Sequence, residues 1–103
     1  MIKTGLIGLG NWGKLVLPHL VEYSNLLMCS NKNNLYSKKW LNTNFPQIRH
    51  TFNYKDIFID NRIDSVFITS TISNHYKMAL GALRSGKHVF VEKPLSIEKE
   101  EVA

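Results

Sequence analysis

The sequence predicts an α/β protein built on a doubly wound parallel sheet, with helices on both faces of the sheet in three layers. Short apolar runs alternate along the chain with segments whose apolar residues recur at helical spacing. The most apolar run holds Val66, Phe67 and Ile68 in succession, which is typical of a strand covered on both faces. A glycine-rich turn separates the first apolar run from the first helical segment. This order of strands and helices favours a parallel sheet.

Each element follows from a local pattern. Five apolar runs are expected to form strands, at residues 3–9, 26–29, 48–52, 63–69 and 88–91. Helices are expected between them, at residues 11–23, 35–44, 54–59 and 74–85. Pro18 lies inside the first helix and is expected to kink it, because proline removes a backbone hydrogen bond. Gly86 is placed to end a helix in the left-handed conformation, and Ser96 to begin another helix.

The composition describes one globular domain, residues 1–103. The 44% hydrophobic and 20% charged residues exclude disordered, collagen-like and coiled-coil proteins. No apolar run approaches the roughly 20 residues of a membrane helix, so no membrane partner is expected. Cys29 is the only cysteine, which excludes an internal disulfide and predicts a reducing, cytoplasmic setting.

The net charge of +5 raises the possibility of a basic nucleic-acid module. The longest run of cations is Lys38-Lys39, however, so nucleic acid is not expected as a partner. His19, His50 and His88 are scattered without the spacing of metal ligands, and no metal site is predicted.

Residues 8–13 read G-L-G-N-W-G, the G-x-G-x-x-G pattern of dinucleotide sites, between a strand and a helix. Gly8 would allow a tight turn, Gly10 a close approach of backbone to a pyrophosphate, and Gly13 close packing of helix and strand. The phosphates would bind free N–H groups at the helix start. The alternative is a flexible turn without a ligand. The residues expected to contact a dinucleotide here are Gly8, Gly10, Asn11, Trp12 and Gly13.

The position about 20 residues after the turn normally carries an acid that accepts hydrogen bonds from the adenosine ribose. Here it carries Ser30, Asn31 and Lys32, and no acid occurs between Glu22 and Asp56. These side chains suit a ribose 2′-phosphate, so NADP is favoured over NAD as the cofactor. The alternative is that Lys32 is only a solvated turn residue.

The end of the chain carries a second motif. Residues 91–96 read V-E-K-P-L-S, and with residues 82–89 and 54–64 they resemble the Gfo/Idh/MocA oxidoreductases over essentially the whole chain. The resemblance implies an N-terminal Rossmann domain that binds NAD or NADP. A C-terminal α/β domain of the family lies beyond this chain, and the last helix has barely begun, so we expect a truncated member that is inactive alone.

The resemblance also implies an activity and site residues. Family members transfer hydride at a hydroxyl or carbonyl carbon of sugars, polyols and related small molecules, and assemble as homo-oligomers. Lys93 matches a family lysine beside the nicotinamide and is the candidate catalytic residue, with a surface lysine as the alternative. The other residues carried over as cofactor contacts are Glu92, Pro94, Ser70, Thr71 and His75.

The loop after residue 69 departs from the family pattern, because Thr71 replaces the usual proline and Ile72 the usual asparagine. A local capping or packing role is the alternative for His75. For the whole chain, the alternative to an enzyme domain is a non-catalytic dinucleotide sensor or regulator of the same fold. A catalytic histidine in the missing domain would distinguish the two.

Overall fold

The computed structural model describes residues 2–32, 34–69 and 72–91, and for residues 11–12 and 72–75 it describes the backbone alone. The strands are β1 (Lys3–Ile7), β2 (Asn25–Ser30), β3 (Arg49–Thr51), β4 (Ser65–Ile68) and β5 (His88–Val91). The helices are α1 (Asn11–Tyr23), α2 (Leu35–Asn44), α3 (Lys55–Ile59) and α4 (Ile72–Arg84). Every predicted strand and helix within the described residues is present, and the ends differ by a few residues at most. The helix expected from Ser96 lies outside the described residues.

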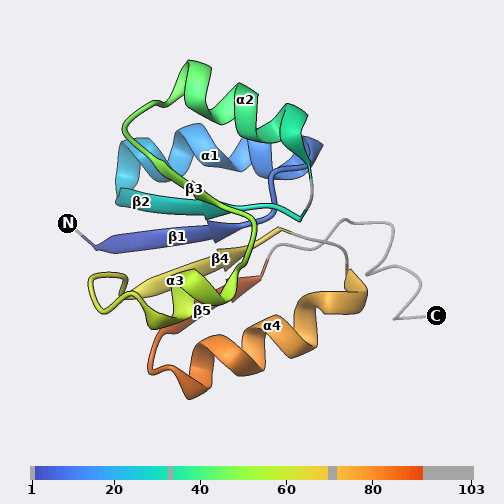
Figure 1. Ribbon diagram of the computed structural model, residues 1–103. Helices are drawn as coiled ribbons and strands as arrows, with labels where there is room; N and C mark the ends of the chain where they lie inside the picture. Colours follow the sequence, from blue (N-terminus) through green and yellow to red (C-terminus); the bar gives the residue numbers. More distant parts are fainter. Residues whose placement is uncertain (1, 33, 70–71, 92–103) are drawn as a thin grey trace.

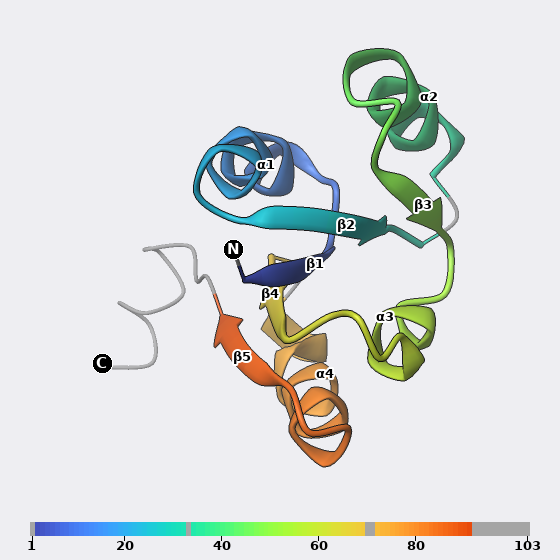
Figure 2. The ribbon, with the colours of Figure 1, turned by 90° about the vertical axis from the view of Figure 1, so that its left-hand side faces the viewer.

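All neighbouring strands are parallel, in the order β3-β2-β1-β4-β5. The chain moves outward from β1 to β3, then crosses to the other side of β1 to form β4. Helices α1 and α2 cover one face of the sheet, and α3 and α4 cover the other (Figures 1 and 2). This confirms the doubly wound, three-layer prediction and puts the reversal of strand order between β1 and β4, where such folds bind ligands.

Alternate residues of the central strand supply two separate cores. Leu6 is completely buried in the cluster beneath α1 and α2, together with Leu17 and Leu41. Its neighbour Ile7 belongs to the cluster beneath α3 and α4, together with Ile57. A strand that is apolar on both faces therefore anchors both helical layers, as expected of a buried parallel sheet.

Two local predictions, for Pro18 and Gly86, can be compared with the structure. Helix α1 continues through Pro18 to Tyr23 as one helix, and Pro18 is exposed, so water can replace the hydrogen bond that proline cannot make. Gly86 has φ +80°, which confirms the left-handed end of α4. Cys29 is completely buried, and burial raises the pKa of its thiol, which fits an inert core residue. None of the described helices is long and apolar enough to cross a membrane.

Candidate dinucleotide site

A cavity of about 700 Å³ opens at the carboxyl ends of β1, β2 and β4. Because all strands are parallel, the segments that follow β1, β2, β3 and β4 meet at this edge of the sheet. Gly8 and Gly10 line the cavity from one segment, Ser30 from the next, and Phe52 and Thr69 from the other two. A concave site at the reversal of strand order is the usual ligand site of an open α/β sheet.

The three glycines of the turn have different local surroundings. Gly8 has φ +106°, a conformation that side chains disfavour. A Cβ atom on Gly13 would lie 2.1 Å from the Gly8 carbonyl oxygen, so only glycine lets α1 approach the turn this closely. A Cβ atom on Gly10 would meet no atom of the described residues within 4 Å. The chain thus leaves open space beside Gly10, where the sequence predicts a pyrophosphate.

Neighbouring segments hold the turn through its backbone. The Gly8 N–H donates to the Ser30 carbonyl oxygen at 2.8 Å, which ties the turn to the end of β2. The Thr69 hydroxyl donates to the Gly8 carbonyl oxygen at 3.0 Å, and the buried Ser37 hydroxyl donates to the Leu9 carbonyl oxygen at 2.9 Å. The carbonyl groups of the turn are therefore held by protein donors from the end of β4 and from α2.

The start of α1 fits an anion. Gly10 is the N-cap residue, no side chain in the described part of the chain caps the helix, and the first turn of the helix carries no acidic residue. The first N–H groups of a helix have no partner within the helix, and the helix dipole makes this end positive. A 13-residue helix that begins beside the open space at Gly10 can therefore bind a phosphate through its backbone.

The residues predicted to contact the ribose lie at the end of β2 and directly after it. Ser30 is 2% exposed, and its Oγ atom is buried without a hydrogen-bond partner among the described residues. Buried polar atoms normally have a partner, so an unpartnered hydroxyl on a residue that lines a cavity fits a site for a polar ligand. Lys32 is exposed and also lines the cavity.

Asn31 differs from its two neighbours. Its Nδ2 atom donates to the Asn34 carbonyl oxygen at 2.8 Å, and its Oδ1 atom contacts Nε2 of His50. Asn34 in turn begins α2, with its side chain accepting from the Ser37 N–H at 3.1 Å. The predicted donation from Asn31 to a ribose phosphate is thus limited to its remaining amide proton, because the rest of the amide holds the loop.

Other cavity residues carry no recognisable motif in the sequence. Lys55 and Lys77 join Lys32 around the cavity, and none of the described residues lining it is acidic. Phe52 and Tyr54 contribute aromatic surface from the segment after β3. The signal that could have found this segment is the parallel topology, which brings the end of β3 to the same edge as the glycine turn.

Several predicted site residues lie outside what the structure describes. Ser70, Thr71, Glu92, Lys93 and Pro94 are not among the described residues. Asn11 and Trp12 begin α1 and His75 lies in α4, and only the backbone of these residues is described. Within the described ranges, no group of three His, Cys, Asp or Glu side chains could hold a metal ion.

The family model for the oxidoreductase family with an NAD-binding Rossmann fold matches residues 2–103. The chain belongs to the Gfo/Idh/MocA oxidoreductase family. The match covers both the glycine turn and the V-E-K-P segment, so the family resemblance predicted from these two motifs is confirmed. The cavity beside Gly10 thus lies at the carboxyl edge of the sheet in a Gfo/Idh/MocA Rossmann domain.

Two curated relatives come from Bacillus subtilis. The uncharacterized oxidoreductase YrbE is 32% identical over 99% of this chain and 30% of its own length. The scyllo-inositol 2-dehydrogenase (NADP(+)) IolW is 27% identical over 97% of this chain and 28% of its own length. The chain therefore spans about 30% of the length of these Gfo/Idh/MocA relatives.

Solved structures agree with the fold. The myo-inositol 2-dehydrogenase of Lactobacillus plantarum superposes with a TM-score of 0.81 and 29% identity, over 91% of this chain and 28% of its own. The scyllo-inositol dehydrogenase of Lactobacillus casei, solved with NAD(H) and scyllo-inositol, gives the same TM-score, identity and coverage. This Gfo/Idh/MocA chain corresponds to the NAD-binding domain of such dehydrogenases.

Proposed function

We propose that this chain binds NADP(H) or NAD(H) as the cofactor domain of an oxidoreductase that acts on a sugar, polyol or related small molecule. One observation carries the proposal: the open space at Gly10 faces an uncapped helix start in a cavity that also holds the unpartnered Ser30 hydroxyl. The similar solved structures support the substrate class, since two of them are inositol dehydrogenases.

The cofactor would lie along the carboxyl edge of the sheet. Its pyrophosphate would bind the backbone from Gly10 to Trp12, and its adenosine ribose would lie beside Ser30 and Lys32. Phe52 and Tyr54 would offer aromatic surface at the adenine end. Bound in this way, the nicotinamide would supply or accept a hydride, which is chemistry that side chains lack.

NADP is the cofactor we favour. The acid that would bind the ribose hydroxyls of NAD is absent, and the exposed Lys32 offers a cation to a 2′-phosphate. Lys55 and Lys77 add positive charge to the same cavity. The relatives include an enzyme named for NADP(+) and one solved with NAD(H), so this choice depends on residues rather than on family.

Lys93 is the proposed catalytic residue, with Glu92 and Pro94 completing its motif and Ser70, Thr71 and His75 near the nicotinamide. An ammonium group beside the reacting carbon–oxygen bond would stabilise the developing alkoxide charge. Substrate turnover would need the second domain of the longer protein, so we expect this chain to bind cofactor without turning over polyols. YrbE is named as an oxidoreductase and IolW as a dehydrogenase, which gives the sensor alternative no support.

The outer strand β5 carries exposed apolar residues that favour assembly. Phe90 and Val91 on the outer strand β5 are exposed at 51% and 37%, and they offer apolar surface for another domain or a second copy. We propose a homo-oligomeric, cytoplasmic parent protein, which analytical ultracentrifugation and fractionation of the longer protein would test.

Calorimetric titration of the chain with NADPH and NADH tests the proposed function. We expect measurable, weak binding of both and tighter binding of NADPH. Gly10→Val should abolish binding and leave the circular dichroism spectrum unchanged, because its side chain would fill only the open space intended for the pyrophosphate. Folded wild-type chain that gives no heat with either cofactor at millimolar concentration would contradict the proposal.

A further inference from the structure

The contacts of Asn31 fix the orientation of its amide. A backbone carbonyl only accepts hydrogen bonds, so the group of Asn31 that faces the Asn34 carbonyl must be the NH₂ group, at 2.8 Å. The amide oxygen therefore faces Nε2 of His50. Because an amide oxygen only accepts, Nε2 must donate, which requires the neutral Nε2–H tautomer or the imidazolium.

This arrangement removes a hydrogen-bond acceptor from the ribose end of the cavity. Sites for NAD place an acceptor after the second strand, where it binds the ribose hydroxyls. The Asn31 amide oxygen and the Ser30 hydroxyl are the side-chain acceptors that Ser30-Asn31-Lys32 could supply in place of a carboxylate, and His50 occupies one of the two acceptor positions of the amide oxygen. Lys32 and the second amide proton of Asn31 are donors, and the Ser30 hydroxyl can donate or accept.

His50 lies one layer behind the cavity. It is half-buried on β3, and its ring meets the ring of Phe52 edge-on at a centroid distance of 4.6 Å. Phe52 lines the cavity, and the Lys38 ammonium lies 5.5 Å from its ring centroid. Burial, and then the charge of Lys38, lower the pKa of His50, so its ring is neutral at pH 8.

Protonation of His50 adds charge without breaking the contact with Asn31. The imidazolium keeps its Nε2–H donor and gains a proton on Nδ1. The groups around it are Lys38 from α2 and the neutral Cys29 paired beside it on β2. Along its own segment, Arg49 precedes it and Asp56 accepts a hydrogen bond from Thr51.

We propose that His50 is a positioning residue that strengthens the preference for NADP through Asn31. It withholds the Asn31 amide oxygen from the ribose hydroxyls of NAD, and in its protonated form it adds positive charge behind the site of the 2′-phosphate. The inference rests on the proposed function, because it assigns the choice between two cofactors at the same cavity.

The test compares the affinities of NADPH and NADH for wild-type, His50→Ala and His50→Gln chains at pH 8 and pH 6, by calorimetry. At pH 8, His50→Ala should lower the NADPH preference about threefold, because the freed amide oxygen can accept from NADH. His50→Gln keeps a donor and should retain the wild-type preference. His19→Gln, on the exposed side of α1, is the control for loss of a histidine elsewhere.

The measurements at pH 6 separate the charge of protonated His50 from its hydrogen bond to Asn31. A phosphate group takes up a proton near pH 6, so NADPH binding changes in every variant, and His50→Gln gives this baseline. The wild-type preference for NADPH at pH 6 should exceed that of His50→Gln by about threefold. Nitrogen-15 spectra of the free chain should also show the Nε2–H tautomer for His50 at pH 8.

The outcomes distinguish this inference from the proposed function. If both cofactors bind and His50→Gln matches the wild type at both pH values, the role of His50 in charge is overturned. An Nδ1–H tautomer, or an unchanged preference in a folded His50→Ala chain, would overturn its hold on Asn31. Failure of the wild-type chain to bind either cofactor would overturn the proposed function itself.

Discussion

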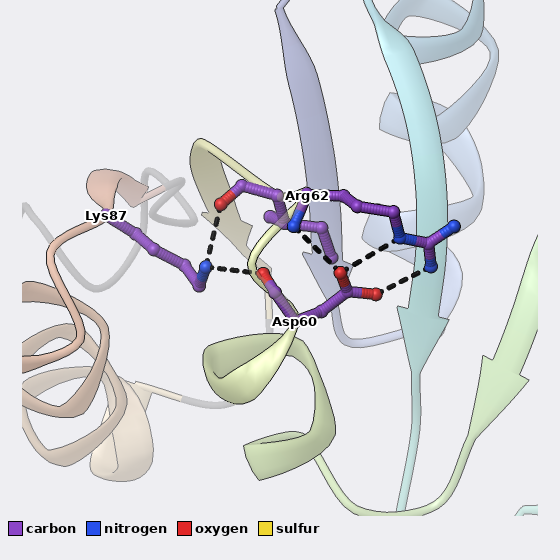
Figure 3. Close-up of polar contacts among 4 residues, drawn as sticks. Asp60, Arg62 and Lys87 are labelled. Carbon is purple, nitrogen blue, oxygen red and sulfur yellow. Dashed lines mark hydrogen bonds and ion pairs between the residues drawn. The ribbon is translucent and has the colours of Figure 1, made fainter.

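The two ends of the sheet use their polar residues in opposite ways. At the amino ends of β4 and β5, Asp60, Arg62 and Lys87 join in one closed cluster (Figure 3). At the carboxyl ends, the Ser30 hydroxyl lacks a partner among the described residues, and three lysines surround a cavity without a described acidic neighbour in its lining. At the amino end, the polar side chains of this cluster find their partners within the protein, while the carboxyl end has room for a charged ligand.

The closed end depends on an unusual lysine. Lys87 is only 7% exposed, and its Nζ atom donates to the carbonyl oxygens of Asp60 at 2.8 Å and Ile63 at 2.7 Å. The Arg62 guanidinium pairs with the Asp60 carboxylate at 2.7 Å, and the Arg62 backbone N–H donates to the same carboxylate. The hydrogen bonds from Arg62 lower the pKa of Asp60 to about 2. The two hydrogen bonds from Lys87 thus link the start of β5 to the turn before β4.

A buried polar group without a partner indicates a binding site only where it lies beside a cavity that a ligand can enter. Burial of an unpartnered polar atom costs about 1–3 kcal/mol, which a fold tolerates where the atom serves binding. Substitutions at the two ends should therefore separate stability from binding, and their expected effects run from the largest to the smallest.

Two glycines of the same turn should respond differently to alanine. Gly13→Ala should destabilise the fold by about 3 kcal/mol or more, because its Cβ atom would overlap the Gly8 carbonyl oxygen. Gly10→Ala should keep the free energy of unfolding within about 0.5 kcal/mol, because its Cβ atom meets nothing. Urea denaturation measures both, and equal losses would contradict the geometry of the turn.

Two lysines at opposite ends of the sheet should also differ. Lys87→Met should lower the free energy of unfolding by about 2 kcal/mol, because it removes both hydrogen bonds to backbone carbonyls. Lys32→Met should leave stability unchanged and weaken the binding of NADPH. The same urea denaturation and calorimetry check the pair, and a stable Lys87→Met chain would show that the closed cluster is dispensable.

The ribose end of the cavity should respond in cofactor choice. We expect the wild type to prefer NADPH about tenfold, or about 1.4 kcal/mol, and Lys32→Ala to remove most of that preference. Ser30→Asp should reverse it, since a carboxylate repels the 2′-phosphate and accepts from the ribose hydroxyl of NAD. Wild-type chain that binds NADH more tightly than NADPH, or a preference that Lys32→Ala leaves unchanged, would refute this assignment.

The smallest effect concerns Asp60 and depends on pH. Its pKa in the folded chain is about 2, below the ordinary value of 3.8, so the ionised carboxylate stabilises the fold above about pH 4. This contribution is lost as the pH falls from about 4 through the folded-state pKa, and it is gone near pH 1. Asp60→Asn should lower stability by about 1 kcal/mol at pH 7, and the difference from the wild type should shrink below pH 4 and vanish near pH 1. A difference that stays unchanged from pH 7 to pH 1 would exclude the ion pair as its cause.

The sequence predicts the local structure at both ends of the sheet well. The glycine spacing, the strands and the helices follow from patterns within a dozen residues, and the left-handed Gly86 follows from its place at the end of a helix. The contacts that hold the glycine turn in place do not follow from such local patterns. Ser37 and Thr69 reach the turn from segments about 30 and 60 residues away, so their roles depend on the strand order.

Asn31 illustrates the same limit within the site. Its place after β2 predicts a cofactor contact, but its amide is held by Asn34 and by His50, a residue 19 positions away on β3. The closed cluster is equally hidden in the sequence, because Lys87 looks like a surface residue until the turn before β4 packs against it.

Amide chemical shifts during a titration with NADPH test the contrast between the two ends most directly. The account predicts that the largest shifts fall in residues 8–13, 30–34 and 52–55, while residues 60–64 and 86–88 stay unchanged. Saturating NADPH that shifts the amides around Asp60 and Lys87 most strongly, or shifts none, would contradict the assignment of the carboxyl edge as the dinucleotide site.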